Sequence, residues 1–177
     1  MKASEPAFAA LVRRYQRTVY SIALRMLSDR HRAEDLAQEV FLQLYRSLDD
    51  IGSDAHLAFW LRKVTVNRAI DRIRQEARYD NEPLSEAAAV AEDVVDADPL
   101  LQRHLAELVA QLPPAARAVV VLRYQEDLDP VDIASTLDMP INTVKSHLKR
   151  SLTSLRARVV GAALVDDVQP SMSEPTR

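Results

Sequence analysis

Hydrophobic residues recur at three- and four-residue steps through the first half of the chain. This spacing places them on one face of an α-helix. The pattern predicts one helix with apolar positions from Phe8 to Leu27, a second from Ala33 to Leu48, and a third from about Leu57 to Arg78. We therefore expect a bundle of three helices in this half.

Residues 128–155 predict a helix-turn-helix. Asp129 is placed to cap the first helix, and Pro130 occupies its first position, where a missing N–H costs nothing. Residues 138–140 then break the helix, and Asn142 is predicted to cap the second one.

The second helix of this unit has two unlike faces. Its apolar stripe consists of Ile141, Val144, Leu148, Leu152 and Leu155. The rest of its early surface is polar and cationic, formed by Asn142, Thr143, Lys145, Ser146, His147, Lys149 and Arg150. The major groove of DNA accepts a helix of this kind, so we interpret the polar face as a reading face. The alternative is a solvated amphipathic helix in a larger bundle.

The charge of the chain is unevenly distributed, although its formal net charge is −3. Residues 1–78 carry a net charge of +4, residues 79–100 of −7, residues 101–160 of +2, and residues 161–177 of −2. The acidic segment contains no cation and several helix breakers, as is typical of a linker. We predict an all-α protein in which two small helical domains, 1–78 and 101–160, are joined by a flexible acidic linker and followed by a disordered tail.

Composition excludes several classes of function. The chain has two glycines, which is too few for a glycine-rich phosphate loop, and no cysteine, which rules out disulfides and thiolate metal sites. No apolar run approaches the roughly 18 residues of a membrane span. We expect a cytoplasmic protein with no membrane insertion, no metal and no cofactor.

The second and third helices have surfaces suited to partners. On the second helix, Leu42 lies among carboxylates, which suggests a protein contact or an ordinary wet face. The third helix combines Phe59 and Trp60 with several arginines, as in sites for single-stranded nucleic acid. Trp60 alone is more often a core residue. The polar stretch 47–57 before this helix is expected to be a loop that could hold an extruded base.

These segments together resemble the extracytoplasmic-function (ECF) class of bacterial RNA polymerase sigma factors, which belongs to the sigma-70 family. Residues 33–48 are similar to the helix of that family that binds core polymerase, and residues 59–74 to its promoter-melting helix. Residues 112–124, followed by the helix-turn-helix, are similar to sigma domain four. The order and spacing of the three motifs are specific, and the resemblance covers about residues 5–158.

The resemblance implies a role for each segment. Domain 1–78 would bind the β′ clamp helices of core RNA polymerase and would recognise and melt the minus-ten element, while domain 101–160 would read the minus-thirty-five element and meet the β flap. The residues that would contact polymerase are Asp35, Gln38, Glu39 and Leu42. The residues that would contact the minus-ten element are Ile51, Gly52, Ser53, Asp54, Arg62, Lys63, Asn67, Arg68 and Arg72. The loop before the third helix, together with Asn67, would capture a flipped base. The exposed residues of the reading helix would contact the minus-thirty-five element. The class also implies control by an anti-sigma factor and a function in binding rather than catalysis.

Two other functions stay open at this point. A dimeric helix-turn-helix repressor or activator would bind an inverted repeat without polymerase. A helical metal-dependent enzyme would need a carboxylate cluster, for which the candidates are Asp49 with Asp50 and Asp54, or His31 with Glu34 and Asp35. The first set does not share one helix face, and no second acidic cluster lies on a partner helix.

Overall fold

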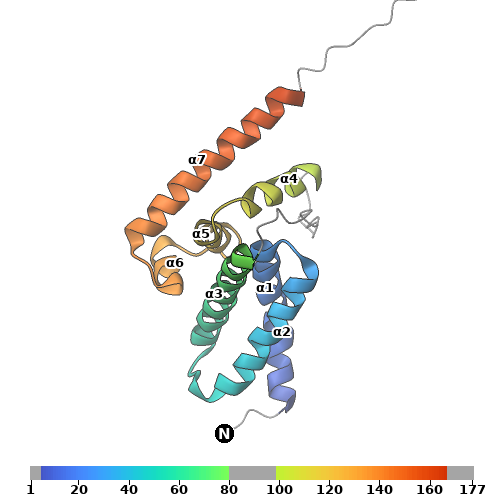
Figure 1. Ribbon diagram of the computed structural model, residues 1–177. Coiled ribbons are helices and arrows are strands. Elements are labelled where there is room, and N and C mark those ends of the chain that lie inside the picture. Colours follow the sequence, from blue (N-terminus) through green and yellow to red (C-terminus); the bar gives the residue numbers. More distant parts are fainter. Residues whose placement is uncertain (1–4, 80–98, 167–177) are drawn as a thin grey trace, which may run out of the picture.

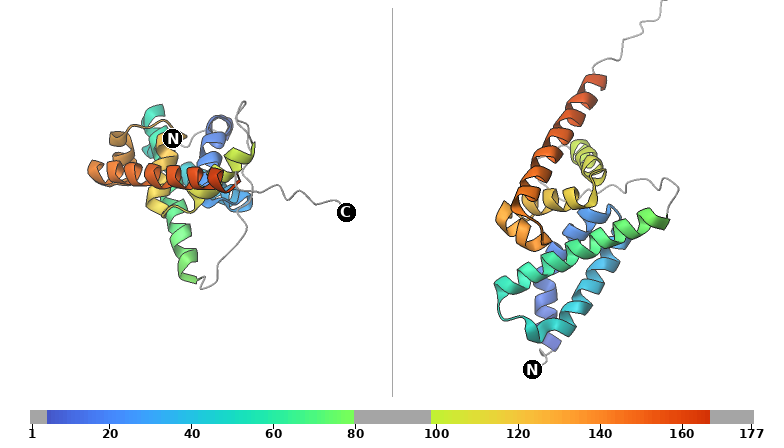
Figure 2. Two further views of the ribbon diagram at one scale, coloured as in Figure 1. Left: turned by 90° about the horizontal axis from the view of Figure 1, so that it is seen from above. Right: turned by 60° about the vertical axis from the view of Figure 1, so that its left-hand side comes forward.

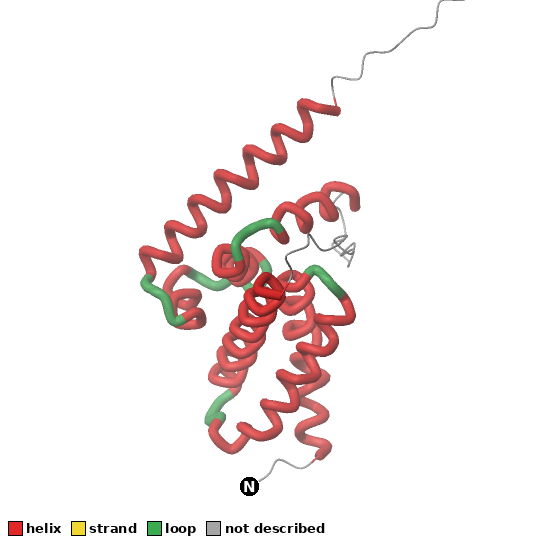
Figure 3. The backbone as a smooth tube through the Cα atoms, viewed as in Figure 1, coloured by secondary structure: helices red, strands yellow, loops and turns green. Residues whose placement is uncertain are grey.

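The computed structural model describes residues 5–79 and 99–166, and this part of the chain consists of helices and short connections (Figures 1 and 3). The first half forms α1 (Glu5–Leu27), α2 (Arg30–Ser47), the short 3₁₀ helix η1 (Leu48–Asp50) and α3 (Asp54–Tyr79). The second half forms α4 (Pro99–Ala110), α5 (Pro114–Tyr124), α6 (Pro130–Leu137) and α7 (Ile141–Asp166). The all-α prediction is confirmed.

Helices α1, α2 and α3 pack around the apolar positions that the sequence pattern marked. Ile22, Met26, Leu36, Leu44 and Leu61 are among the largest fully buried side chains. The chain reverses sharply between α1 and α2, because Ser28 adopts a left-handed φ of 57° and the Asp29 side chain accepts a hydrogen bond of 2.8 Å from Arg32 N. This cap fixes the start of the helix that carries the predicted polymerase face.

The stretch 47–57 is more helical than predicted. After η1 only residues 51–53 are irregular, and α3 begins at Asp54 rather than near Leu57. The Ser53 hydroxyl accepts a hydrogen bond of 3.2 Å from His56 N, so a serine cap starts the helix earlier than its apolar pattern indicated. The predicted long polar loop was therefore wrong.

The helix-turn-helix has the predicted turn and one different cap. Asp129 accepts hydrogen bonds of 2.8 Å from both Val131 N and Asp132 N, as expected of an N-cap. Helix α7, however, begins at Ile141, and the Pro140 carbonyl accepts the first amide bonds, so Asn142 lies in the first turn and is not the cap. The prediction for Asn142 was wrong. Pro140 is the residue directly before the helix, and its carbonyl accepts hydrogen bonds from Thr143 N and Val144 N, so no side-chain cap from Asn142 is formed there.

Helix α7 is also longer than the predicted domain. It passes through Gly161 and ends at Asp166, so the boundary drawn after residue 160 falls inside a helix. A glycine inside a helix costs only about 1 kcal/mol, which a long helix tolerates. The linker predicted at 79–100 falls mainly on residues 80–98, which lie outside the described residues, as does the tail beyond Asp166.

The two halves pack against each other. One hydrophobic cluster contains Val19 and Ile22 of α1, Leu61 of α3, Leu122 of α5 and Ile133 of α6. The views of Figure 2, like that of Figure 1, show α5 and α6 lying against the first bundle. A smaller cluster, formed by Leu108, Leu112, Ala116, Val120 and Leu155, joins α4, α5 and α7. The two predicted units thus share buried surface.

Candidate nucleic-acid interface

An open groove of about 830 Å³ follows α3 on the side that faces α2. Phe59 and Trp60 lie at one end, and the groove continues along α3 to Gln75, with Glu39 and Gln43 of α2 also lining it. Of the residues predicted for the minus-ten element, the groove brings together Lys63, Asn67, Arg68 and Arg72. We call this feature the α3 groove.

The arginines of the α3 groove are held in place from α2. Arg68 donates through Nε and Nη2 to Gln43 Oε1, at 3.0 and 2.7 Å, and its Nη1 lies 2.9 Å from Glu39 Oε2. Arg72 lies 2.7 Å from the other oxygen of Glu39 and donates to the Arg32 carbonyl at 3.1 Å. These bonds orient two planar guanidinium groups, which suit phosphate oxygens, while Glu39 neutralises part of their charge.

Trp60 contributes both to the hydrophobic core and to the α3 groove. Its ring is half-buried and packs against the hydrophobic cluster, as the core interpretation predicts, and it also lines the α3 groove. Beside it, the Lys63 ammonium lies 5.8 Å from the centre of the Phe59 ring. The groove therefore presents aromatic surface next to cations, which are the components of a site for unpaired bases.

Of the residues predicted for base capture, Asn67 lines this groove and the loop residues do not. Ile51 is half-buried against the core, and Ser53 caps α3. The Asp54 carboxylate accepts a hydrogen bond of 2.7 Å from Arg14 of α1, and this bond raises the pKa of Arg14. With a rise of 1.5 Å per residue, Asp54 and Asn67 are separated by about 20 Å along α3. The loop and Asn67 therefore lie at different ends of the surface.

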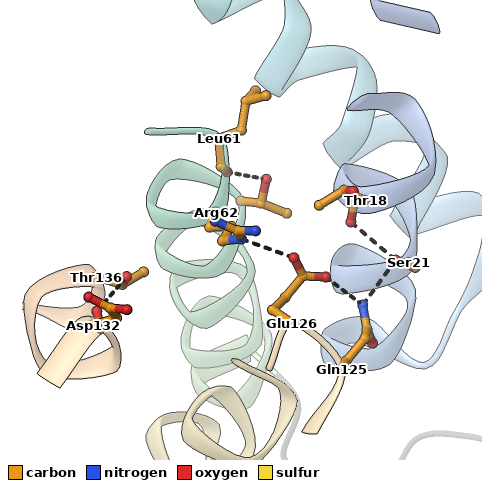
Figure 4. Close-up of polar contacts among 9 residues, drawn as sticks. Thr18, Ser21, Leu61, Arg62, Gln125, Glu126, Asp132 and Thr136 are labelled. Atoms are coloured by element: carbon orange, nitrogen blue, oxygen red, sulfur yellow. Dashed lines mark hydrogen bonds and ion pairs between the residues drawn. The ribbon is translucent and has the colours of Figure 1, made fainter. Parts of the chain in front are cut away.

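Arg62 also points away from the predicted strand path. Its Nε donates to Glu126, which follows α5, at 2.9 Å (Figure 4). Its neighbour Lys63 lies 2.8 Å from Asp138, the residue that ends α6. Gln125 donates to the Ser21 hydroxyl at 2.9 Å, also across the two halves. Two cations predicted to hold the promoter strand are thus paired with anions of the second half.

The predicted polymerase residues are all exposed on α2, but they do not share one face. Asp35, Gln38, Glu39 and Leu42 are exposed, and Leu42 is 60% accessible. Gln38 and Leu42 line a second groove, of about 900 Å³, between α1 and α2, whereas Glu39 faces α3. The predicted set is therefore divided between two sides of the helix.

Sequence reasoning missed the aromatic wall of this second groove. It is formed by Phe8 and Tyr20 of α1 with Phe41 and Tyr45 of α2, and the rings of Phe8 and Tyr45 meet edge to face at 5.0 Å. Tyr45 follows Leu42 by three residues and is also exposed. Spacing of i and i+3 places both on one helix face, and this signal could have revealed the apolar patch.

The reading face of α7 is open. Asn142, Thr143, Lys145, Ser146, Lys149 and Arg150 are exposed, and His147 is half-buried. Val144 and Leu155 of the apolar stripe are buried against the rest of the fold. Within the described part of the chain, the three cations of this face form no ion pair. The face is accessible along its length, in contrast to Arg62 and Lys63.

The alternative metal site has little support in the geometry. His31 and Asp35 approach to 3.7 Å on adjacent turns of α2. Among residues 5–79 and 99–166, no three histidine or carboxylate side chains come together as ligands for a metal ion.

Both halves of the chain match known families. Residues 11–79 match Sigma-70 region 2, and residues 102–155 match Sigma-70, region 4. The ECF RNA polymerase sigma factor SigW of Bacillus subtilis (strain 168) is 31% identical over 172 residues, which cover 89% of this chain and 91% of SigW. The ECF RNA polymerase sigma factor SigE of Mycolicibacterium smegmatis is 34% identical over 161 residues, covering 88% of this chain and 62% of SigE.

Solved structures show the same fold. The sigma factor RpoE, in complex with the anti-sigma factor NepR from Bartonella quintana, matches with a TM-score of 0.70 and 19% identity, covering 85% of this chain and 94% of RpoE. CnrH, in complex with the cytosolic domain of CnrY, matches with a TM-score of 0.63 and 21% identity, covering 94% of this chain and 92% of CnrH.

A helical bundle of region 2 followed by a helix-turn-helix of region 4 defines the sigma-70 class of transcription initiation factors. Within this class, the chain belongs to the ECF RNA polymerase sigma factors. None of the helices in the described residues is long and apolar enough to cross a membrane.

Proposed function

We propose that this sigma factor binds core RNA polymerase through the exposed face of α2 and directs it to promoters that α7 and the α3 groove recognise. The carrying observation is that one chain holds an open cationic helix-turn-helix face and, on another helix, a groove of aromatic and guanidinium groups. The first suits duplex DNA and the second an unpaired strand. A promoter that is melted at one element and double-stranded at the other presents both.

For the minus-ten element, the α3 groove supplies the path of the strand. Arg68 and Arg72 would contact phosphates, and Asn67 and Trp60 would meet bases that melting has exposed. The loop of residues 51–53 precedes Asp54, which lies about 20 Å from Asn67 along α3, so the loop would contact a different nucleotide from Asn67. We therefore assign base capture to the loop, with Gly52 and Ser53 as its exposed part, and strand holding to the groove.

For the minus-thirty-five element, α7 would lie in the major groove. Asn142, Thr143 and Ser146 would reach base edges, while Lys145, Lys149 and Arg150 would neutralise phosphates. Three phosphate contacts give weak binding to free DNA at physiological salt. Docking on polymerase adds affinity by holding both reading surfaces near one promoter, an effect of roughly 10²- to 10⁴-fold.

For polymerase, the exposed edge of α2 supplies the contact. Leu42 and Tyr45 offer apolar surface, with Asp35 and Gln38 beside it. Exposed apolar residues rimmed by polar groups are typical of protein interfaces. The β′ clamp helices would bind here, and the β flap would meet the second half of the chain.

An anti-sigma factor is the proposed regulator. RpoE and CnrH, whose folds this chain shares, were solved with NepR and with CnrY respectively, and NepR is described as an anti-sigma factor.

We propose that this chain acts in the cytoplasm as a binding protein without catalytic activity, because transcription initiation by this class consists of recognition and docking.

The test combines the purified chain with bacterial core RNA polymerase and measures co-elution and transcription from genomic fragments. The variant Asp35→Ala, Gln38→Ala, Leu42→Ala should lose co-elution and transcription; Glu39 is left unchanged because it orients Arg68 and Arg72. The variant Lys145→Ala, Lys149→Ala, Arg150→Ala should keep co-elution and lose defined start sites. Tight binding of an inverted repeat by the chain alone, without polymerase binding, would instead identify a conventional repressor or activator.

A further inference from the structure

We propose that Lys145 and Lys149 of α7 are acylation sites, and that acylation of their amines weakens the hold of α7 on duplex DNA. The donor is an activated acyl group that carries phosphate, either an acyl phosphate or an acyl thioester of a phosphate-bearing thiol. The inference rests on the proposed function, because that function gives the reading face of α7 a duplex to hold.

Lysine is rare in this chain and is concentrated on the proposed DNA surfaces. Of 23 lysine and arginine residues, four are lysine, at positions 2, 63, 145 and 149. Lys63 lines the α3 groove, Lys145 and Lys149 lie on the reading face, and Lys2 lies outside the described residues. Arginine also binds phosphate, but lysine alone has an amine that acyl donors modify. The modifiable cations of the described chain are therefore those proposed to meet DNA.

The two amines of α7 are more accessible than that of Lys63. Lys145 and Lys149 are exposed, and neither forms an ion pair with another described residue. The Lys63 side chain is 32% exposed, and its ammonium lies 2.8 Å from the Asp138 carboxylate and 5.8 Å from the centre of the Phe59 ring. These neighbours obstruct the approach of a donor to the Lys63 nitrogen. The α7 pair should therefore react first.

The reading face also attracts the donor. Lys145 and Lys149 are four residues apart, so they are neighbours on the surface of α7, and Arg150 follows directly. Cations that bind the phosphates of DNA also bind the phosphate of a donor, and Arg150 keeps its charge after both lysines have reacted. The donor is thereby held close to the two amines. Because DNA and the donor compete for the same cations, bound DNA should protect both lysines.

The reaction is an acyl transfer from oxygen or sulfur to nitrogen. After losing one proton to water, the lysine Nζ attacks the carbonyl carbon of the acyl group with its lone pair. A C–N bond forms and the bond from the carbonyl carbon to oxygen or sulfur breaks. Phosphate or thiolate leaves with that electron pair and takes up a second proton from the nitrogen. The amide product is neutral, so each acylation removes one positive charge from the reading face.

The test treats the purified full-length chain with acetyl phosphate and, in a parallel arm, with acetyl coenzyme A, and locates acetyl groups by mass spectrometry. In at least one arm, Lys145 and Lys149 should be acetylated about two- to fivefold faster than Lys63, which its ion pair protects. Saturating duplex DNA of mixed sequence, at low salt, should slow acetylation of both. After treatment, the slope of log K against log salt for this duplex should be shallower by about 1.8, because two phosphate contacts are lost. Thermal unfolding verifies that the treated chain is folded.

Arginine variants separate acylation of α7 from other effects of the treatment. Each chain is compared with itself before and after treatment, so its initial affinity for DNA does not enter the comparison. Treatment should not change the affinity of the variant Lys145→Arg, Lys149→Arg, whereas the matched control Lys63→Arg should lose affinity as the natural chain does.

Three results would overturn the proposal: no acetylation of the α7 pair in either arm, faster acetylation of Lys63, or an equal loss of affinity in the double variant. If the α7 lysines are acetylated but the untreated chain binds no duplex DNA, either alone or with polymerase, the proposed function fails instead. The mass measurement is independent of that result.

Discussion

Glu39 on α2 lies 2.7 Å from Arg72 on α3, and its other carboxylate oxygen lies 2.9 Å from Arg68. One side chain therefore connects the helix proposed to bind polymerase with the helix proposed to hold the promoter strand. The sequence placed Glu39 among residues that contact polymerase, whereas its position toward α3 gives it a second effect on charge in the α3 groove. This effect can be measured without polymerase.

Replacing Glu39 with glutamine should strengthen binding of single-stranded DNA to the isolated chain. Glutamine removes the negative charge that offsets Arg68 and Arg72, so each guanidinium attracts phosphates more strongly. If one further phosphate is neutralised, the slope of log K against log salt should steepen by about 0.7. Fluorescence anisotropy of a labelled minus-ten strand at several salt concentrations gives this slope.

The matched control is Asp35→Asn. Asp35 is also an exposed carboxylate on α2, but it lies 3.7 Å from His31 and pairs with no arginine of α3 in the described residues. The same change of charge should leave the salt slope unaltered. Equal slopes for both variants would mean that Glu39 acts only through the net charge of the chain.

Trp60 should report strand binding by its fluorescence. It is the single tryptophan of the chain, it is half-buried, and it lines the α3 groove. Bases that stack near its ring should quench its emission, since aromatic side chains in such grooves contact bases directly. Titration with a single-stranded minus-ten oligonucleotide should lower the emission, and Arg72→Ala should shift the titration to higher concentration. Duplex DNA of the same sequence, which keeps its bases paired, should leave the emission nearly constant.

The apolar pattern was sufficient to predict α1, α2, most of α3 and the exposed polar face of α7. Three- and four-residue spacing identified the core of the first bundle and the buried stripe of α7, because these signals are local. The cap at Asp129 was also predicted, since aspartate before proline satisfies amide groups within three residues. The predicted cap at Asn142 was wrong, because the backbone carbonyl of Pro140, rather than a side chain, accepts the first amide hydrogen bonds of α7.

The sequence could not show which surfaces meet. Arg62 and Glu126 are 64 residues apart, and nothing in the spacing of either residue indicates their contact. The groove between α1 and α2 likewise depends on Phe8 and Tyr45 meeting across two helices. The predicted roles of the site residues remain predictions, but the geometry separates those that share the α3 groove from Arg62 and the loop.

Replacing Asp129 with alanine should destabilise the helix-turn-helix by about 1 kcal/mol. The carboxylate accepts two amide hydrogen bonds at the start of α6, and alanine leaves both amides without their protein acceptor. Urea unfolding followed by circular dichroism would give the difference in free energy. Asp129→Asn keeps an oxygen acceptor and should stay within a few tenths of a kcal/mol of the natural chain. A loss as large as that of alanine would show that charge, rather than the hydrogen bonds, carries the effect.

Replacing Arg117 with alanine should lower the free energy of unfolding by about 2–3 kcal/mol at neutral pH. The carbonyls of Met26 and Leu112 lose their hydrogen-bond donor, and the shorter side chain leaves a buried space. Arg123→Ala is the comparison: Arg123 donates to the Leu128 carbonyl at 2.9 Å, and this bond lies within the second half. Burial lowers the pKa of Arg117 to about 10. The unfolded chain therefore holds this proton more tightly, so the charge opposes folding at lower pH and this opposition falls as the pH rises through 10. The difference in unfolding free energy between the natural chain and Arg117→Ala should grow between pH 8 and pH 10.5, whereas the difference for Arg123→Ala should stay constant. A difference that shrinks with pH would mean that the charge of Arg117 stabilises the interface.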